Sequence, residues 1–258
     1  MKIANRLAGT CLLSVLTFLA VPGALAHEFI VKPAQDMDDT TTVEATLMVT
    51  EVYMTPDRLP PETTILHVVT EEGQTPVDLS VNEDRQTMDA AFSTPEGAYL
   101  LVGQSERTRP VKPPRGAPEP AEGTPTPMLR MQAFSKAVVD PKGSGVYAQT
   151  PLGLRLELVP QQALDTVAAG DTVSFNILFD GAPVSARVQA TYDGHTTEEH
   201  GYVVRTESDE TGVAEVTFSE PGLWIVRTKV VREEAGDGYD QYEGASNIII
   251  PVAPAEGE

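Results

Sequence analysis

The chain contains very little cysteine, which limits its redox chemistry and its metal ligands. Its 258 residues include one cysteine, Cys11. One cysteine cannot form an internal disulfide. Cys11 follows Thr10, where a lipid-attachment signal requires a smaller residue, so we expect no lipid anchor. After residue 26 the chain has no thiol, so any metal held there has nitrogen and oxygen ligands.

Basic residues are also scarce. The chain has 18 Lys and Arg against 38 Asp and Glu, a formal net charge of −20. Such a chain repels nucleic acid and anionic lipid, so we expect neither as a partner. Beyond the first residues no apolar run approaches the roughly 20 residues of a membrane helix, so we expect no direct membrane insertion.

The motifs of common enzymes are missing as well. The sequence has no Gly-x-Ser-x-Gly elbow, no His-Glu-x-x-His helix and no phosphate-binding loop. We therefore expect a binding protein and not an enzyme. One enzyme class stays open as a minor alternative, the copper oxygenases that clasp their metal with an N-terminal histidine on a β-sandwich.

The first 26 residues have the features of a signal peptide. Lys2 and Arg6 give a positive start, an apolar run follows, and Ala24-Leu25-Ala26 places small residues where a signal peptidase reads them. We expect cleavage after Ala26 and a soluble product in the periplasm.

Cleavage there makes His27 the first residue of the working protein. An N-terminal histidine carries an α-amine and an imidazole, which can close a chelate ring on one metal ion. The α-amine has a reference pKa of about 7.7–8.0, so it deprotonates more easily than a lysine. His27 is thus a candidate metal ligand, although it can equally be the residue that happens to follow the cut.

The remainder of the chain reads as short strands separated by turns. We expect strands near 28–31, 42–52, 63–70, 77–81, 88–92 and 97–102, and again near 151–160, 173–179, 184–192, 202–206, 214–218, 223–231 and 246–252. Residues 128–139 fit a helix or a strand about equally well. In the last part, Trp224 alternates with Val226, which places it in a core.

A proline-rich stretch divides these strands into two groups. Seven prolines fall between Pro110 and Pro127, which predicts an exposed linker or long loop at 103–127. We therefore expect an all-β protein with two β-sandwich domains: an N-terminal β domain at 27–102 and a C-terminal β-sandwich domain at 128–252. Residues 253–258 are expected to be a disordered tail.

The second group of strands carries an ordered set of motifs. They are TPLGLRLELVP at 150–160, GD at 170–171, DGAPV at 180–184, SDETG at 208–212, PGLW at 221–224 and Ser246, together with AHEF at 26–29. The set resembles a bacterial family of periplasmic proteins of unassigned function, often labelled as associated with nickel or cobalt uptake and often beginning with His. The resemblance implies an immunoglobulin-like or transthyretin-like C-terminal domain and a role in handling a divalent metal beside a membrane transporter. Only His27 carries over as a ligand. Members often show a second histidine in an early strand, and the comparable residues 50–54 have none.

Three further histidines are candidates for the same metal. His67 lies in a predicted strand, where it is either packed or a ligand. His195 and His200 would face opposite sides of a continuous strand, so they can share an ion only if 193–200 is a loop. With Glu198 and Glu199 between them, such a loop offers nitrogen and oxygen donors to nickel, zinc or copper. The same residues can equally form a polar hairpin tip.

Two functions remain after these exclusions. The first is a periplasmic protein that binds nickel or cobalt, with copper as a third option, and assists metal uptake or handling. The second is a non-catalytic β-sandwich that binds a protein or a glycan, since a β-sandwich fold does not fix function. A tight, stoichiometric metal site favours the first function, and indifference to metal favours the second.

Overall fold

The computed structural model describes residues 27–34, 42–112, 116, 121, 123–139, 147–199 and 201–255. Within these residues the chain forms strands and no helical element, which confirms the all-β prediction. The strands are β1 Glu28–Pro33, β2 Thr42–Val52, β3 Thr55–Arg58, β4 Ile65–Thr70, β5 Gly73–Val77, β6 Ser80–Asn82, β7 Thr87–Ser93, β8 Leu100–Pro110, β9 Met128–Val138, β10 Leu156–Pro160, β11 Thr172–Phe179, β12 Ala182–Pro183, β13 Arg187–Tyr192, β14 Val204–Glu207, β15 Val213–Thr217, β16 Gly222–Arg232 and β17 Gln241–Val252. The predicted leader, 1–26, lies outside the described residues.

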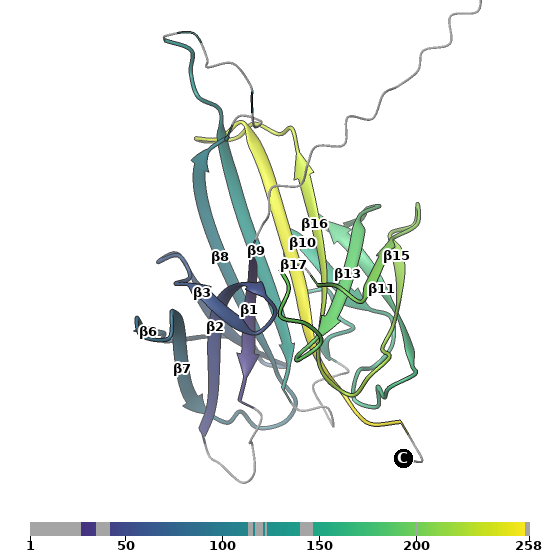
Figure 1. Cartoon of the computed structure of the whole chain (residues 1–258). Helices are drawn as coiled ribbons and strands as arrows, with labels where there is room; N and C mark the ends of the chain where they lie inside the picture. The colour runs from purple at the N-terminus through teal and green to yellow at the C-terminus, as the bar shows by residue number, and fades with distance from the viewer. Residues whose placement is uncertain are drawn as a thin grey trace, which may run out of the picture.

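The strands form three sheets. The long sheet has eight strands in the order β14-β13-β16-β17-β9-β8-β4-β5. The first small sheet has the order β1-β2-β7-β6, with β3 beside β2, and the second has β10-β11-β12, with β15 beside β11. Figure 1 shows β8, β9, β17 and β16 running side by side through the molecule, with β1, β2, β3 and β7 at the lower left and β11 and β15 at the right.

The long sheet is buried on both faces. Along β16, Leu223 and Ile225 belong to one hydrophobic core and Trp224 and Val226 to the other, because successive side chains of a strand point to opposite faces. The first small sheet supplies the rest of the core that contains Leu223 and Ile225. The second small sheet supplies the rest of the core that contains Trp224 and Val226. Two β-sandwiches therefore share one central sheet, and Trp224 lies fully buried as predicted.

The proline-rich segment begins later than the sequence indicated. Residues 103–110, expected in the linker, continue β8 and pair with β9 from Leu100 opposite Val138 to Pro110 opposite Met128. The outer half of β8 carries charged residues and is only partly buried, so it lacks the clear apolar alternation that identified other strands. Hydrogen bonding continues to Val111, whose N–H donates to the Pro127 carbonyl at 2.8 Å.

Two other ambiguous segments are resolved by pairing. Residues 128–138 form a strand, β9, because they pair with β8 on one side and with β17 on the other. The predicted tail starts later than residue 253: Ala253 forms a bridge with Ala168, and its N–H donates to the Val167 carbonyl at 2.9 Å. Residues 256–258 lie outside the described residues.

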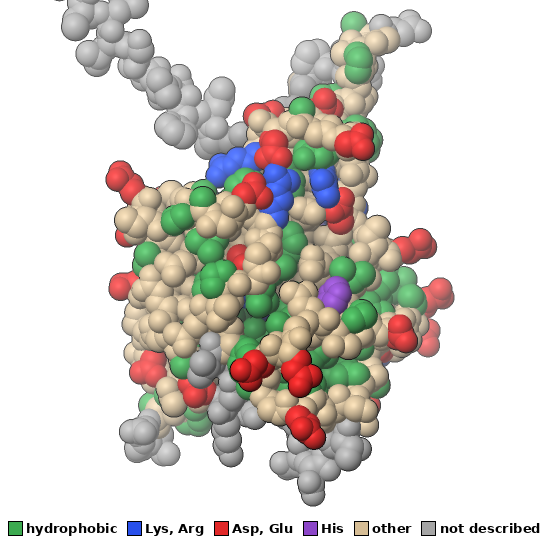
Figure 2. All heavy atoms as spheres, turned by 180° about the vertical axis from the view of Figure 1, so that it is seen from behind, with side chains coloured by type: hydrophobic (Ala, Val, Ile, Leu, Met, Phe, Trp, Pro, Cys, Tyr) green, Lys and Arg blue, Asp and Glu red, His purple; other side chains and the backbone are tan. Residues whose placement is uncertain are grey.

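Charge is distributed unevenly over the surface. Figure 2, which shows the molecule from behind, has basic side chains gathered at one end of the body beside acidic ones, and isolated acidic side chains along the margins. On this face the protein therefore has local positive charge that its negative net charge does not describe.

Candidate metal centre

His27 lies immediately before β1, opposite an acidic residue of β2. In the β1–β2 ladder, Glu28 pairs with Thr50 and Phe29 with Val49. Extending this antiparallel register by one residue sets His27 across from Glu51. Facing residues of antiparallel strands have Cβ atoms about 4.5–5.5 Å apart, so their side chains meet. The ladder itself therefore brings the imidazole to the Glu51 carboxylate.

The β2–β3 hairpin supplies a second carboxylate. The ladder between β2 and β3 is irregular at two places: Val49 pairs with Arg58, Thr50 with Pro56 and Val52 with Thr55. This leaves Glu51 on β2 and Asp57 on β3 without a partner in the ladder. A bulge of this kind changes the direction of a side chain, and bulges are common beside functional sites.

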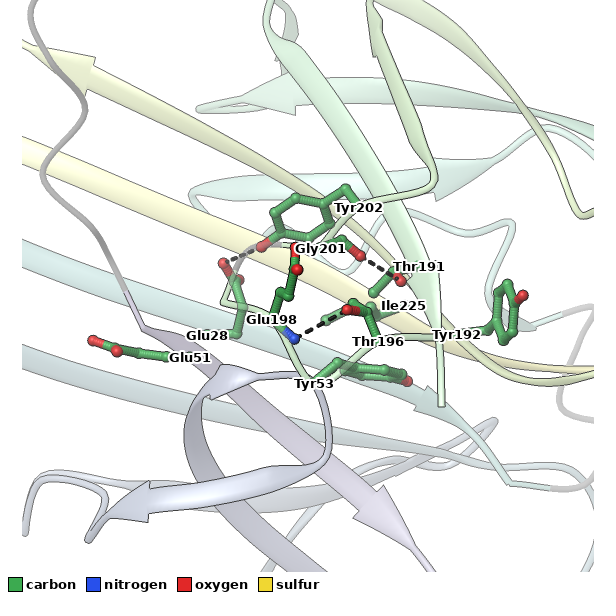
Figure 3. Close-up of a pocket in the computed structure, with 10 residues that line it drawn as sticks. All are labelled: Glu28, Glu51, Tyr53, Thr191, Tyr192, Thr196, Glu198, Gly201, Tyr202 and Ile225. Carbon is green, nitrogen blue, oxygen red and sulfur yellow. Dashed lines mark hydrogen bonds between the residues drawn. The ribbon is translucent and has the colours of Figure 1, made fainter. Parts of the chain in front are cut away.

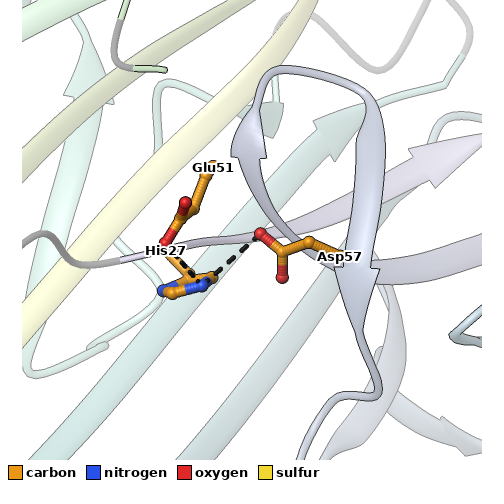
Figure 4. A group of neighbouring side chains, drawn as sticks. All are labelled: His27, Glu51 and Asp57. Atoms are coloured by element: carbon orange, nitrogen blue, oxygen red, sulfur yellow. Dashed lines mark ion pairs between the residues drawn. The ribbon is translucent and has the colours of Figure 1, made fainter.

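The three side chains converge on one point. His27 Nε2 lies 2.8 Å from Glu51 Oε1 and 3.5 Å from Asp57 Oδ2, and the candidate ligand atoms all lie within 4.8 Å of one another. Figure 4 shows the two carboxylates directed at the imidazole, one from each strand of the hairpin. The donor set is one imidazole nitrogen and two carboxylate oxygens, which suits first-row divalent metals.

The electrostatic surroundings favour a neutral imidazole. Burial lowers the pKa of His27 below its ordinary value, and the charge of Arg58 lowers it further, while Asp57 and Glu51 act in the opposite direction. Only the neutral imidazole can bind a metal. Since the net shift is downward, His27 is available as a ligand at neutral pH.

Strand β1 is fixed to the long sheet by buried polar contacts. Glu28 Oε1 lies 2.8 Å from Arg227 Nη1 and accepts a hydrogen bond from Tyr202 Oη at 3.0 Å. The side chain of Asn247 donates to the Phe29 carbonyl at 2.7 Å, and the Val31 N–H donates to Ser135 Oγ at 3.0 Å. These contacts hold the residues that follow His27, so its position is set by the long sheet.

A small cavity adjoins the site and brings in the loop after β13. It has a volume of about 20 Å³, space for one water-sized group, and Glu28, Glu51, Glu198 and Tyr202 are among its lining residues. Figure 3 shows Glu198, from the loop, beside Glu28. The loop that carries the predicted His195 and His200 therefore approaches Glu51. His195 itself is exposed and its ring lies 5.1 Å from that of Tyr192, while His200 lies outside the described residues.

His67 is distant from His195. It lies in β4, and its Nδ1 is buried without a hydrogen-bond partner in the described part of the chain. In the long sheet, β4 and β13 are separated by β8, β9, β17 and β16, which amounts to about 24 Å at ~4.8 Å per strand. His67 and His195 therefore cannot share one ion.

Glu51 and Asp57 were missed in the sequence. The sequence indicated chiefly histidines as ligands after residue 26, and it gave no indication of β3. The available signal was the pair of acidic residues on either side of Tyr53 and Met54. Met54 has a φ of 64°, a left-handed conformation uncommon for a residue other than glycine, and it allows the tight hairpin that brings Asp57 back to Glu51.

Comparison with protein families gives a match over most of the chain. A family described as "Domain of unknown function (DUF4198)" matches residues 24–232. The chain belongs to this family. DUF4198 membership agrees with the predicted resemblance to a family of unassigned function, and it says nothing of nickel, cobalt or a transporter. No curated protein matches the chain.

Solved structures resembling this DUF4198 protein are remote. A "Biofilm associated protein - BSP domain" is 14% identical with a TM-score of 0.21, over 85% of this chain and 28% of that one. The chicken CNTN1 FN1-FN3 domains are 9% identical with a TM-score of 0.21, over 90% of this chain and 68% of that one. The chain thus spans less than a third of the first, and neither likeness carries an argument about function. None of the described residues forms a helix with the length and apolarity that a membrane crossing requires.

Proposed function

We propose that this DUF4198 protein is exported to the periplasm and there binds one divalent metal ion through His27, Glu51 and Asp57. Its role is to assist uptake or handling of that metal, as a binding protein and not as an enzyme. A membrane metal transporter is the expected partner. The convergence of three ligand atoms within 4.8 Å of one another carries the proposal.

The charges at this site favour a bound divalent cation over an ion pair between His27 and the carboxylates of Glu51 and Asp57. At neutral pH the lowered pKa of His27 leaves the imidazole uncharged, so it does not neutralise the two carboxylates beside it. The side chains of Glu51 and Asp57 are only about 28% and 30% exposed. A divalent cation compensates both charges and also uses the imidazole lone pair.

Nickel or cobalt is the proposed cargo, with copper as the alternative. The described site offers nitrogen and oxygen donors, which exclude a preference for Cu(I), because that ion selects thiolate and thioether ligands. Imidazole together with carboxylate suits divalent first-row ions. The motif resemblance to proteins labelled for nickel and cobalt uptake favours these two among them.

The structure also distinguishes two ways in which His27 can act. A chelate ring through the α-amine and the imidazole of one histidine closes through Nδ1, whereas the carboxylates face Nε2. The chelate through the α-amine of His27, called here the N-terminal clasp, therefore uses a different ring nitrogen from the three-residue site formed by His27, Glu51 and Asp57. A form with an extra N-terminal Met lacks the clasp, because its amine becomes an amide, but it keeps the three-residue site.

Calorimetric titration with nickel tests the proposal. The protein beginning at His27 should bind one ion, and the Met-extended form should bind it with similar affinity. His27→Ala, Glu51→Gln and Asp57→Asn should each weaken binding by at least the roughly 10–100-fold that loss of an outer-shell partner costs. His195→Ala is the matched control and should bind as the parent does. Absence of binding in the parent rejects the metal function and favours the scaffold alternative, and loss in the Met-extended form alone identifies the clasp.

A further inference from the structure

A second cavity opens directly beside His27, between the first small sheet and the long sheet. Its volume is about 60 Å³, which accommodates a few water-sized groups. Its lining includes Ser105, Ala133 and Ala245 from the long sheet. These three residues are neighbours across β8, β9 and β17, and their small side chains leave the space open. His27 lines the same cavity.

Two arginines also line this cavity, Arg58 from β3 and Arg107 from β8. Within the described part of the chain, every other cavity-lining charge has a partner: Glu106 pairs with Arg130 and Glu243 with Lys229. Neither Arg58 nor Arg107 makes an ion pair or a side-chain hydrogen bond with a described residue. In a chain with 38 acidic and 18 basic residues, two adjacent arginines without acidic partners are unexpected.

The two guanidinium groups lie close enough to affect each other and the imidazole. Burial lowers the pKa of Arg107, and the charges of Arg58 and Arg109 lower it further, while the charge of Glu243 acts in the opposite direction. Both Arg58 and Arg107 also lower the pKa of His27. The arginines remain charged at any physiological pH. The lining carboxylates Glu106 and Glu243 are already paired with Arg130 and Lys229, so an added anion would be the ion-pair partner that Arg58 and Arg107 lack among the described residues.

A bound metal and a bound anion would stabilise each other in this cavity. Three protein ligand atoms leave at least one coordination position of a divalent ion open, since even zinc takes four ligands. Arg58 and Arg107 would repel a bare cation placed at His27. An anion that both ligates the metal and pairs with the arginines fills the open position and removes the repulsion. An anion with two carboxylates does both, because one can ligate the metal while guanidinium binds the other through two parallel hydrogen bonds.

We propose that the protein takes up its metal as a complex with a small dicarboxylate, one carboxylate ligating the metal beside His27 and the other held by Arg58 and Arg107. This inference rests on the proposed metal function and names the form of the cargo. The cavity volume of about 60 Å³ limits the organic part to a molecule near the size of malonate. Binding of metal and of dicarboxylate should therefore be cooperative, and each should raise the affinity for the other by the same factor.

Calorimetry with nickel and malonate, each alone and together, tests the inference. Malonate should bind nickel-loaded protein on the order of tenfold tighter than metal-free protein, after correction for nickel–malonate association in solution. Acetate, whose single carboxylate cannot ligate the metal and pair with the arginines at the same time, should show no such gain. Arg58→Gln and Arg107→Gln should abolish the gain while keeping nickel affinity without malonate at least at the parent value. Arg85→Gln, on an exposed arginine that pairs with Asp89, is the control and should keep the gain.

The two proposals fail in different ways. Nickel binding that malonate does not improve, or a malonate gain that survives both arginine substitutions, overturns the inference and leaves the metal function standing. Malonate binding of equal strength with and without nickel also overturns it. Failure of nickel to bind under every condition, with circular dichroism showing a folded protein, overturns both.

Discussion

At the residue scale, the decisive side chain is His27, whose lowered pKa predicts the pH dependence of metal binding. Metal needs the neutral imidazole, so affinity should stay constant from about pH 8 down to pH ~6.5, the ordinary histidine value, and fall only below it. A clasp through the α-amine would instead lose affinity already between about pH 8 and 7, where that amine takes up its proton. Nickel titrations across this range distinguish the two. A fall that begins near pH 8 would contradict ligation through Nε2.

Trp224 supports a second residue-scale prediction. It is fully buried, its indole N–H donates to the Glu220 carbonyl at 2.9 Å, and its ring meets that of Phe218 edge-on at 5.0 Å. Trp224→Ala should lower the free energy of unfolding by about 3–5 kcal/mol, measured by urea denaturation. Val231→Ala, at a position 54% exposed, should change it by no more than about 0.5 kcal/mol. A loss below roughly 1 kcal/mol for Trp224→Ala would contradict the burial of this residue.

The sequence identified some site residues and not others, for reasons visible in the ladder. His27 was found because the cleavage predicted after Ala26 singles it out. Glu51 and Asp57 were not, because the chain has 38 acidic residues and nothing in their local pattern separates these two from the rest. Their position depends on the β1–β2 register and on the β2–β3 irregularity, which the sequence alone does not specify.

At the element scale, β1 can approach β8 because residue 103 is glycine. A Cβ at this position would overlap Cγ2 of Val31 and lie 3.1 Å from Cε1 of Phe29. Gly103→Ala should therefore cost about 1–3 kcal/mol of unfolding free energy, the usual effect of overpacking, and should weaken nickel binding by displacing the strand that follows His27. The neighbouring substitution Gln104→Ala removes side-chain atoms without adding any to this contact and should leave nickel affinity unchanged. Unaltered stability and binding in Gly103→Ala would show that β1 tolerates the shift.

The buried ion pair between Lys136 of β9 and Glu157 of β10 predicts an asymmetry between two substitutions. Lys136 is fully buried and its Nζ lies 3.1 Å from Glu157 Oε1; burial lowers the pKa of this lysine. The Glu157 carboxylate also accepts backbone N–H hydrogen bonds from residues 152–154. Lys136→Met leaves that carboxylate partly satisfied, whereas Glu157→Leu leaves the buried ammonium alone, so the second should cost more, about 3–5 kcal/mol. Urea denaturation measures both, and the reverse order would contradict this account.

At the scale of the whole molecule, the strand pattern predicted the class of fold but not how its halves connect. Alternation along strands such as β2 and β11 was sufficient for the all-β prediction, because one face of each reaches a core. The central position of β8 and β9 in the long sheet could not be predicted, because local periodicity does not specify which distant strands pair. β8 and β9 pair with each other, and β8 also pairs with β4 from the first half of the sequence while β9 pairs with β17 from the second half. The proline-rich segment therefore joins two adjacent strands of one sheet.

This connection predicts the outcome of proteolysis. Trypsin should cut first after Arg115, which precedes Gly116, since Arg109 and Lys112 are both followed by proline. The two fragments should then stay together through native size-exclusion chromatography, because β8 remains paired with β9 along its whole length and both hydrophobic cores draw residues from each side of the cut. They should separate only in denaturant, and Arg115→Gln should remove the cut. Fragments that separate without denaturant would show instead that 27–102 and 128–252 fold as independent domains.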